Sequence, residues 1–342
     1  MLQVEETMAA RNGEIVTVAM ALDRYEGALL ANPTPYKRTE ASQARKAADA
    51  VLELKGGTGI DKASIGALDL PALKRWARVL PGRDATARLR WGALSRFLEW
   101  CVDEELIETN PSALVAKSRR PAAPEPRDNV AGLEEIAAVW RAAGNEPAPA
   151  LRDLVQFLCL VPCRRQEAAS IEFEDVELDK REWRAPAHKT KNGKSHTLPM
   201  PEQVREIIQR RLKAATDAAS ETKTDTTALT LVFPGPKDCK AFSGWSRLLA
   251  RLRKASGVQE FGFHAIRRGF VTVLGNRGFD ADLLDGMLNH SASETRSGVR
   301  GVYNRSERLQ ERARAMNAWA ELVTAAVSGI DGRVVEFKRR AS

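Results

Sequence analysis

The chain contains five side chains whose types could act together on one substrate: Arg164, His264, Arg267, His290 and Tyr303. Guanidinium groups bind phosphate oxygens bidentately and stay protonated, histidine exchanges a proton near neutral pH, and a tyrosine hydroxyl is a nucleophile. Attack on a phosphodiester builds negative charge on its nonbridging oxygens, and fixed cations stabilise that charge. The set would suit chemistry on an anionic phosphate ester, although each residue alone is a weak signal.

Spacing predicts two pairs of neighbouring side chains on single helix faces, one within this set and one that adds Glu167. Arg164 precedes Glu167 by three residues, and His264 precedes Arg267 by three. Each pair also has a structural interpretation, because an arginine near a glutamate is more often a surface ion pair, and a lone histidine is more often structural. Spacing alone leaves both interpretations open.

Motifs of several other enzyme classes are absent. A phosphate-binding loop ending at residues 193–195 would need glycine where His188 stands, and no GxSxG, HExxH or GxGxxG string occurs. None of the four histidines lies three or four residues from another, so no metal site is predicted. The four cysteines lack CxxC spacing, which fits a reducing compartment.

The length and charge of the chain indicate which kind of protein must position these residues. The chain has 342 residues, which suggests two or three domains. Its formal net charge of +8 leaves binding to a polyanion open, although many basic proteins bind none. It has no apolar run long enough for a membrane helix, and acidic Glu5 and Glu6 stand where a signal peptide would be basic. We expect a cytoplasmic protein.

The first third of the chain predicts a small bundle of four or five helices. Apolar residues recur at helical spacing over residues 16–30, and further helices are predicted at 39–54 and 85–108. Asp69 caps a short helix that has Pro71 in its first turn. The basic, proline-rich segment 117–127 is predicted to be a linker, either solvated or lying along a phosphate backbone.

The rest of the chain is predicted to combine helices with a few short strands. Strand signals occur at residues 175–178, 182–185 and 196–198, and Asn192-Gly193 between the last two is a strong hairpin-turn signal. The predicted helices occupy residues 133–143, 148–160, 166–171, 201–215, 244–255, 264–275, 280–288 and 306–326.

The order of these residues and their local strings resemble the catalytic domain of the tyrosine recombinases, the phage-integrase family. The string VPCRRQEAASIEFED, which contains Arg164, is similar to that family's TGxRxxExxxLxWxDI segment. FHAIRR at His264 looks like its HxLRR box, MLNH ending at His290 looks like its LGH box, and VYNR at Tyr303 resembles the segment around its nucleophile. The resemblance spans residues 130–325.

The sequence departs from the family pattern at a few positions. Pro162 and Cys163 replace a TG-type pair, Ala265 replaces the usual aspartate, and Asn289 replaces glycine. None of these is a catalytic position in the family. The upstream bundle matches the family's core-binding domain in position and type only.

The resemblance implies a role for each matched residue. The catalytic positions are Tyr303, Arg164, Lys191, His264, Arg267 and His290, with Glu167 in support. Tyr303 would attack the phosphorus to form a 3′-phosphotyrosyl link, and a hairpin lysine would protonate the leaving 5′-oxygen. The TKNG string points to Lys191, with Lys189 and Lys194 as alternatives. No cofactor and no metal are implied.

The resemblance also implies the fold class, which is mainly α with a small antiparallel β-sheet. A helical core-binding domain then precedes a mixed α/β catalytic domain. The expected parts are an N-terminal tail at residues 1–15, a SAM-like DNA-binding domain at 16–116, a linker at 117–129, the catalytic domain at 130–328 and a basic tail at 329–342. With about 15 residues ahead of the bundle, we expect no separate arm-binding domain.

The resemblance implies two partners: double-stranded DNA with a specific recombination site, and further copies of the chain in a tetramer on that DNA. Accessory DNA-bending proteins are further candidates. No membrane partner is implied. Basic residues of the bundle are the DNA-binding candidates, namely Arg38, Arg45, Lys46, Arg88 and Arg90. An apolar stripe along residues 309–327 would dock either on a neighbouring copy or on its own domain.

The leading hypothesis is a site-specific DNA recombinase or integrase. A type IB-like DNA-relaxing enzyme would use the same residues with a different outcome. A catalytically inactive DNA-binding regulator would keep the fold, although the presence of Tyr303 and both arginines argues against it. A globular enzyme with chance motifs predicts that four residues do not meet in space, namely Arg164, Arg267, His264 and His290.

Overall fold

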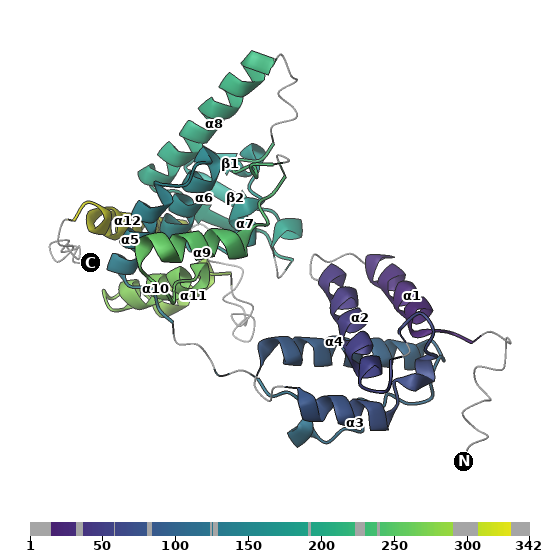
Figure 1. Ribbon diagram of the computed structural model, residues 1–342. Helices are drawn as coiled ribbons and strands as arrows, with labels where there is room; N and C mark the ends of the chain where they lie inside the picture. Colours follow the sequence, from purple (N-terminus) through teal and green to yellow (C-terminus); the bar gives the residue numbers. More distant parts are fainter. Residues whose placement is uncertain are drawn as a thin grey trace. The chain divides into compact units, whose positions relative to one another are not determined.

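The computed structural model describes residues 15–31, 37–57, 59–80, 84–123, 125, 129–190, 193–222, 230–237, 240–289 and 307–329. The chain divides into two compact units, residues 1–127 and 128–342, and the division falls inside the predicted linker. Each unit has its own hydrophobic core. Figure 1 shows the N-terminal unit in purple and blue and the C-terminal unit in teal, green and yellow.

The N-terminal unit is a four-helix bundle of α1 (Val18–Ala31), α2 (Lys37–Glu53), α3 (Leu70–Val79) and α4 (Ala85–Asp103), with short 3-10 helices at Ile65–Ala67 and Lys117–Arg119. As predicted, Asp69 caps α3, and its side chain accepts the Ala72 N–H at 2.8 Å. The fourth helix ends at Asp103 rather than at residue 108, because Glu105 adopts a left-handed φ of 57°. Aromatic rings fill the core, which includes stacked Trp76 and Trp91.

The C-terminal unit combines eight described helices with a small sheet, as expected from the fold class. The helices are α5 (Leu133–Ala143), α6 (Pro149–Leu160), α7 (Arg165–Ala169), α8 (Glu202–Thr222), α9 (Trp245–Ser256), α10 (Phe263–Gly275), α11 (Ala281–Met287) and α12 (Glu307–Val327). Among the described parts of the chain, no helix combines the length and the apolar character that a membrane span requires.

Three antiparallel strands form the sheet in the order β1-β2-β3. They are β1 (Val176–Glu177), β2 (Glu182–Ala185) and β3 (His196–Pro199), and Ala185 pairs with His196 at the end of the β2–β3 ladder. The connection between β2 and β3 runs over residues 186–195, as the predicted strand bounds imply, and it includes the 3-10 helix Ala187–Lys189. Asn192 of the Asn192-Gly193 turn signal lies outside the described residues. Pro186 ends the ladder, since proline has no N–H to donate.

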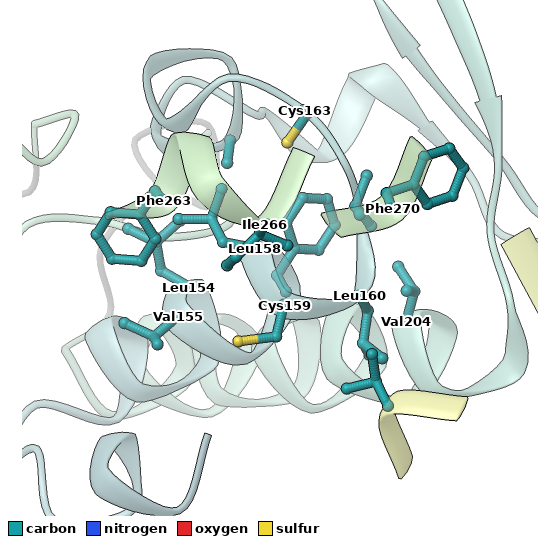
Figure 2. Close-up of a cluster of buried hydrophobic side chains, with 14 of the residues drawn as sticks. Leu154, Val155, Leu158, Cys159, Leu160, Cys163, Val204, Phe263, Ile266 and Phe270 are labelled. Atoms are coloured by element: carbon teal, nitrogen blue, oxygen red, sulfur yellow. The ribbon is translucent and has the colours of Figure 1, made fainter. Parts of the chain in front are cut away.

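Part of the core of this unit lies between α6 and α10. Figure 2 shows Leu154, Leu158 and Leu160 of α6 in one cluster with Ile266 and Phe270 of α10. α6 is buried on almost all sides, whereas α10 keeps part of its surface outside the core, so both helices are held firmly by packing. The ends of these helices carry the segments with the candidate catalytic residues.

The C-terminal helix α12 docks on its own unit. Trp319 is fully buried, its ring lies against Phe270 at 5.5 Å, and its indole N–H donates to the Cys159 carbonyl at 2.9 Å. The apolar stripe of this helix is by itself compatible with docking on a neighbouring copy or on its own domain. In this structure the stripe is buried within the same chain.

Gly269 permits a close backbone approach that joins the start of this unit to α10. A Cβ at this position would lie 2.3 Å from the Ala131 carbonyl oxygen, and the Ala131 N–H donates to the Ala265 carbonyl nearby. The absence of a side chain therefore lets the segment before α5 pack directly on α10.

We predict that Gly269→Ala destabilises the C-terminal unit by about 1–3 kcal/mol, because the neighbouring backbone must shift. Thermal unfolding of purified protein measures this change. The matched control is Gly275→Ala in the same helix, where a Cβ would meet nothing within 4 Å. That control should be neutral or slightly stabilising, since alanine favours helix over glycine. Equal losses in both variants would contradict the prediction.

Candidate functional site

The C-terminal end of α11 presents three successive backbone carbonyls to donors from distant parts of the chain. The Met287 carbonyl accepts from His196 Nε2 at 2.9 Å, the Leu288 carbonyl accepts from Arg267 at 2.7 Å, and the Asn289 carbonyl accepts from Arg164 at 3.1 Å. The last carbonyls of a helix have no partner within the helix, so external donors satisfy them. We call these the carbonyl array, defined by residues 287–289.

Asn289 gives this array its shape. Its φ is 52°, in the left-handed region that favours glycine and tolerates asparagine. This explains the departure from the family's LGH box, because either residue type allows the chain to leave α11 in this conformation. The turn aims successive carbonyls at both arginines.

Arg164 stands immediately before α7 and is held by its own helix. Its backbone N–H and its guanidinium donate to the two carboxylate oxygens of Glu167, at 2.9 and 2.8 Å. Glu167 is buried, whereas 24% of the Arg164 side chain is exposed. The guanidinium therefore has a fixed orientation and still reaches solvent, and it has more N–H donors than these bonds use.

Arg267 is buried on α10, with 3% of its surface exposed. Its guanidinium donates to the Pro162 carbonyl at 2.6 Å and to the Leu288 carbonyl at 2.7 Å. Burial lowers the pKa of Arg267, and the charge of Arg164 lowers it further. Two cations held on neighbouring carbonyls of one turn form a pre-organised site for an anion.

His264 lies one turn before Arg267 on α10 and is exposed. The residue before it, Phe263, packs edge-on against Trp245 with ring centroids 5.5 Å apart. The guanidinium of Arg165 lies over the same Trp245 ring at 5.5 Å. This aromatic contact ties the start of α7 to the start of α10.

The connection between β2 and β3 contains the candidate lysines. Lys189 forms ion pairs with Glu172 at 2.5 Å and Asp175 at 2.7 Å, which makes it a structural residue rather than a candidate acid. Thr190 is buried, and its hydroxyl lies 2.8 Å from the Lys194 carbonyl, which closes the base of the loop. Lys191 itself lies outside the described residues.

Two further predicted site residues, His290 and Tyr303, also lie outside the described residues. Residue 290 follows directly on the carbonyl array in the sequence. The geometry of the site therefore rests on Arg164, Arg267, Glu167 and His264. The chance-motif interpretation is wrong for the two arginines, since they meet on one turn.

Within the described residues, Glu172, Glu174 and Asp175 are the acidic group close enough together to hold a metal ion. The ammonium group of Lys189 already pairs with Glu172 and Asp175. A cation would have to displace this lysine, so the donor set does not fit a metal centre.

The predicted DNA-binding residues of the bundle differ in their surroundings. Lys46 and Arg88 are exposed, Arg90 is half-buried, and Arg45 pairs with Asp23 at 2.6 Å. The side chain of Arg38 lies outside the described set.

Sequence reasoning missed a basic cleft in the N-terminal unit. The cleft has a volume of about 520 Å³ and is lined by the end of α3 and residues 118–122, with Arg78 and Arg119 among them. Arg120 in the same segment is used structurally, since its guanidinium donates to the Ala113 and Val115 carbonyls at 2.7 Å each. The basic linker composition was the signal, but only the fold brings Arg78 beside it.

Sequence reasoning also missed His196. No motif or spacing marked it, and its partner Met287 lies 91 residues away. Burial lowers the pKa of His196 to about 4, and the nearby charge of Arg312 acts in the same direction. The ring is therefore neutral at pH 7, with a proton on the nitrogen that donates to Met287.

A family model described as the phage integrase family matches residues 133–306, about half of the chain. Prophage integrase IntZ of Escherichia coli K12 is 26% identical over 264 residues, which cover 76% of this chain and 60% of that relative. Tyrosine recombinase XerC of Mycobacterium sp. strain KMS is 26% identical over 243 residues, which cover 68% of this chain and 78% of that relative.

Solved structures of low sequence identity share the fold. A lambda integrase dimer bound to a COC′ core site has 16% identity and a TM-score of 0.57, covering 95% of this chain and 80% of that chain. A lambda integrase tetramer bound to a Holliday junction has 19% identity and a TM-score of 0.55, covering 83% and 80%. The chain spans 40% of the length of prophage integrase IntA from E. coli K12 and 60% of IntZ.

We predict that Asn289→Gly keeps the stability of the protein, whereas Asn289→Ala loses about 1–2 kcal/mol. The reason is that alanine in the left-handed region brings its Cβ against the backbone, and glycine has none. Both variants remove the asparagine side chain, so the difference between them isolates the backbone. Thermal unfolding checks it, and equal stability of the two variants would contradict it.

Proposed function

Since this chain belongs to the phage integrase family of tyrosine recombinases, we propose that it is a site-specific DNA recombinase that cleaves and rejoins strands through a 3′-phosphotyrosyl intermediate. The observation that carries the proposal is the pair of arginines held on the carbonyl array, Arg267 at Leu288 and Arg164 at Asn289. A fixed pair of guanidinium groups suits the pentacoordinate state of phosphoryl transfer better than a single mobile one.

In the proposed reaction, the Tyr303 oxygen forms a bond to phosphorus while the bond from phosphorus to the 5′-oxygen breaks. The tyrosine proton passes to His264, and the leaving 5′-oxygen takes a proton from Lys191. Arg164 and Arg267 bind the nonbridging oxygens, and His290 donates a hydrogen bond to one of them. The phosphotyrosyl bond keeps the energy of the phosphodiester, so a 5′-hydroxyl of another strand reverses the step without a nucleotide cofactor.

Arg164 suits a phosphate ligand because its guanidinium group is held in place and its side chain is still partly exposed to solvent. Glu167 holds one side of the guanidinium, the Asn289 carbonyl holds another, and part of the side chain remains exposed. A buried carboxylate beside an arginine fixes its position without neutralising the site as a whole, because Arg267 lies next to it. Losing one such donor costs about 10²–10³ in rate in comparable sites.

Double-stranded DNA is the proposed substrate, and contacts to its phosphates would come from both units. Lys46 and Arg88 are exposed on the bundle, and Arg78 and Arg119 line its basic cleft. Such contacts make binding strongly dependent on salt. By analogy with the tetramer of lambda integrase on a Holliday junction, we propose a tetramer on paired sites, with accessory DNA-bending proteins as further partners and the nucleoid as the place of action.

We predict that Tyr303→Phe binds DNA as the wild type does but forms no covalent complex with it, because the nucleophilic oxygen is missing. The measurement uses nicked DNA carrying the recombination site, followed by denaturing electrophoresis to detect the protein–DNA adduct. A covalent adduct in the variant would remove Tyr303 as the nucleophile. A wild type that cleaves DNA without a specific paired site would favour the type IB-like alternative.

We predict that Lys191→Ala slows cleavage by about 10²–10⁴ on an ordinary 5′-oxygen and far less on a substrate with a 5′-sulfur leaving group, which hardly needs a proton. Single-turnover cleavage of both substrates measures the effect. Lys194→Ala is the matched control from the same loop and should slow both substrates little. A selective loss in the control instead would reassign the acid to Lys194.

A further inference from the structure

His196 occupies a position between the sheet and the candidate site. It begins β3, pairs with Ala185 of β2, and its ring is mostly buried. From there its Nε2–H donates to the Met287 carbonyl at 2.9 Å, the first carbonyl of the array that also receives Arg267 and Arg164. One histidine and two arginines thus satisfy three consecutive carbonyls.

The charges around His196 favour a neutral donor at the Met287 carbonyl. Arg267 and Arg312 are both close enough to His196 for their charges to disfavour its protonation, and Glu167 has the opposite effect. A third buried cation beside these arginines would raise the electrostatic cost of the site. A neutral imidazole satisfies the Met287 carbonyl without adding charge.

The strand that carries His196 is itself firmly attached. The carbonyl of Thr197, the next residue, accepts a hydrogen bond from the Arg312 guanidinium of α12 at 3.3 Å. Leu198 is buried and pairs with Trp183 of β2. The His196 ring therefore acts from a rigid strand onto the last turn of α11.

We propose that His196 is a positioning residue for Arg164 and Arg267, and that it acts by fixing the carbonyl array at the end of α11. This inference rests on the proposed recombinase function, in which those arginines hold the phosphate. In this proposal His196 acts through the Met287 carbonyl and not on the substrate. Without its donor, the buried Met287 carbonyl loses a partner, and the turn that holds both guanidinium groups relaxes.

The test compares His196→Gln with His196→Asn. The glutamine amide nitrogen reaches about as far as Nε2 of histidine, whereas the asparagine amide is one methylene shorter, so both variants stay polar and differ in reach. Ile208→Ala in α8 is the stability control, because it removes buried aliphatic volume outside the array. Thermal unfolding identifies the temperature at which all four proteins are folded.

Three readouts are taken at that temperature: DNA binding, single-turnover cleavage with a 5′-oxygen or a 5′-sulfur leaving group, and hydrogen exchange of the peptide that covers residues 281–289. We expect His196→Asn to slow cleavage at least about tenfold, and equally on both substrates, since displaced arginines affect both. Exchange of the peptide should rise in the same variant. His196→Gln should recover most of the rate, and Ile208→Ala should match the wild type.

Each other outcome overturns the inference. Unchanged cleavage or unchanged hydrogen exchange in His196→Asn means that the array does not depend on the histidine. A loss confined to the oxygen leaving group means that His196 acts through the lysine-bearing loop instead. A similar loss in Ile208→Ala means that general stability is responsible. Failure of the proposed function itself gives a different result, because the wild type would then form no covalent adduct, and the exchange comparison still decides whether His196 holds the turn.

Discussion

The last turn of α11 leaves backbone carbonyls that no N–H of its own helix can reach, and the candidate site is organised around them. Donors from β3, α10 and the start of α7 each satisfy one of these oxygens, at Met287, Leu288 and Asn289. These elements are far apart in the sequence. A shared need for hydrogen-bond partners in a buried turn brings them to one place.

This arrangement allows the guanidinium group of Arg267 to lie in the interior of the unit. Placing Arg267 in the interior costs solvation, and the lowered pKa of its guanidinium reflects that cost. The Pro162 and Leu288 carbonyls offset part of it, and Glu167 on the neighbouring Arg164 balances charge locally. An anionic phosphate arriving at the two guanidinium groups would offset more. The site is therefore most favourable when it is occupied by its proposed substrate.

Local sequence signals predicted most elements well where a single physical rule applies. The helix at Leu133–Ala143 and the strand at Glu182–Ala185 have the predicted bounds, and Asp69 caps α3 as expected. Predictions failed where non-local terms compete. The helix predicted at residues 201–215 extends to Thr222, because its alanine-rich end forms helix without an apolar stripe to signal it.

The sequence by itself determined which residue types are available and in what order: two arginines, their spacing from Glu167 and His264, and the family strings around them. Residue type and helical period are local properties, so a single chain shows them directly. Only the tertiary structure decided that Lys189 is taken up by Glu172 and Asp175, that Trp319 docks α12 on its own unit, and that His196 meets Met287. Those contacts join residues that are distant in the chain. The local sequence pattern is compatible with many other partners for each residue, and only the packing of the whole unit selects these.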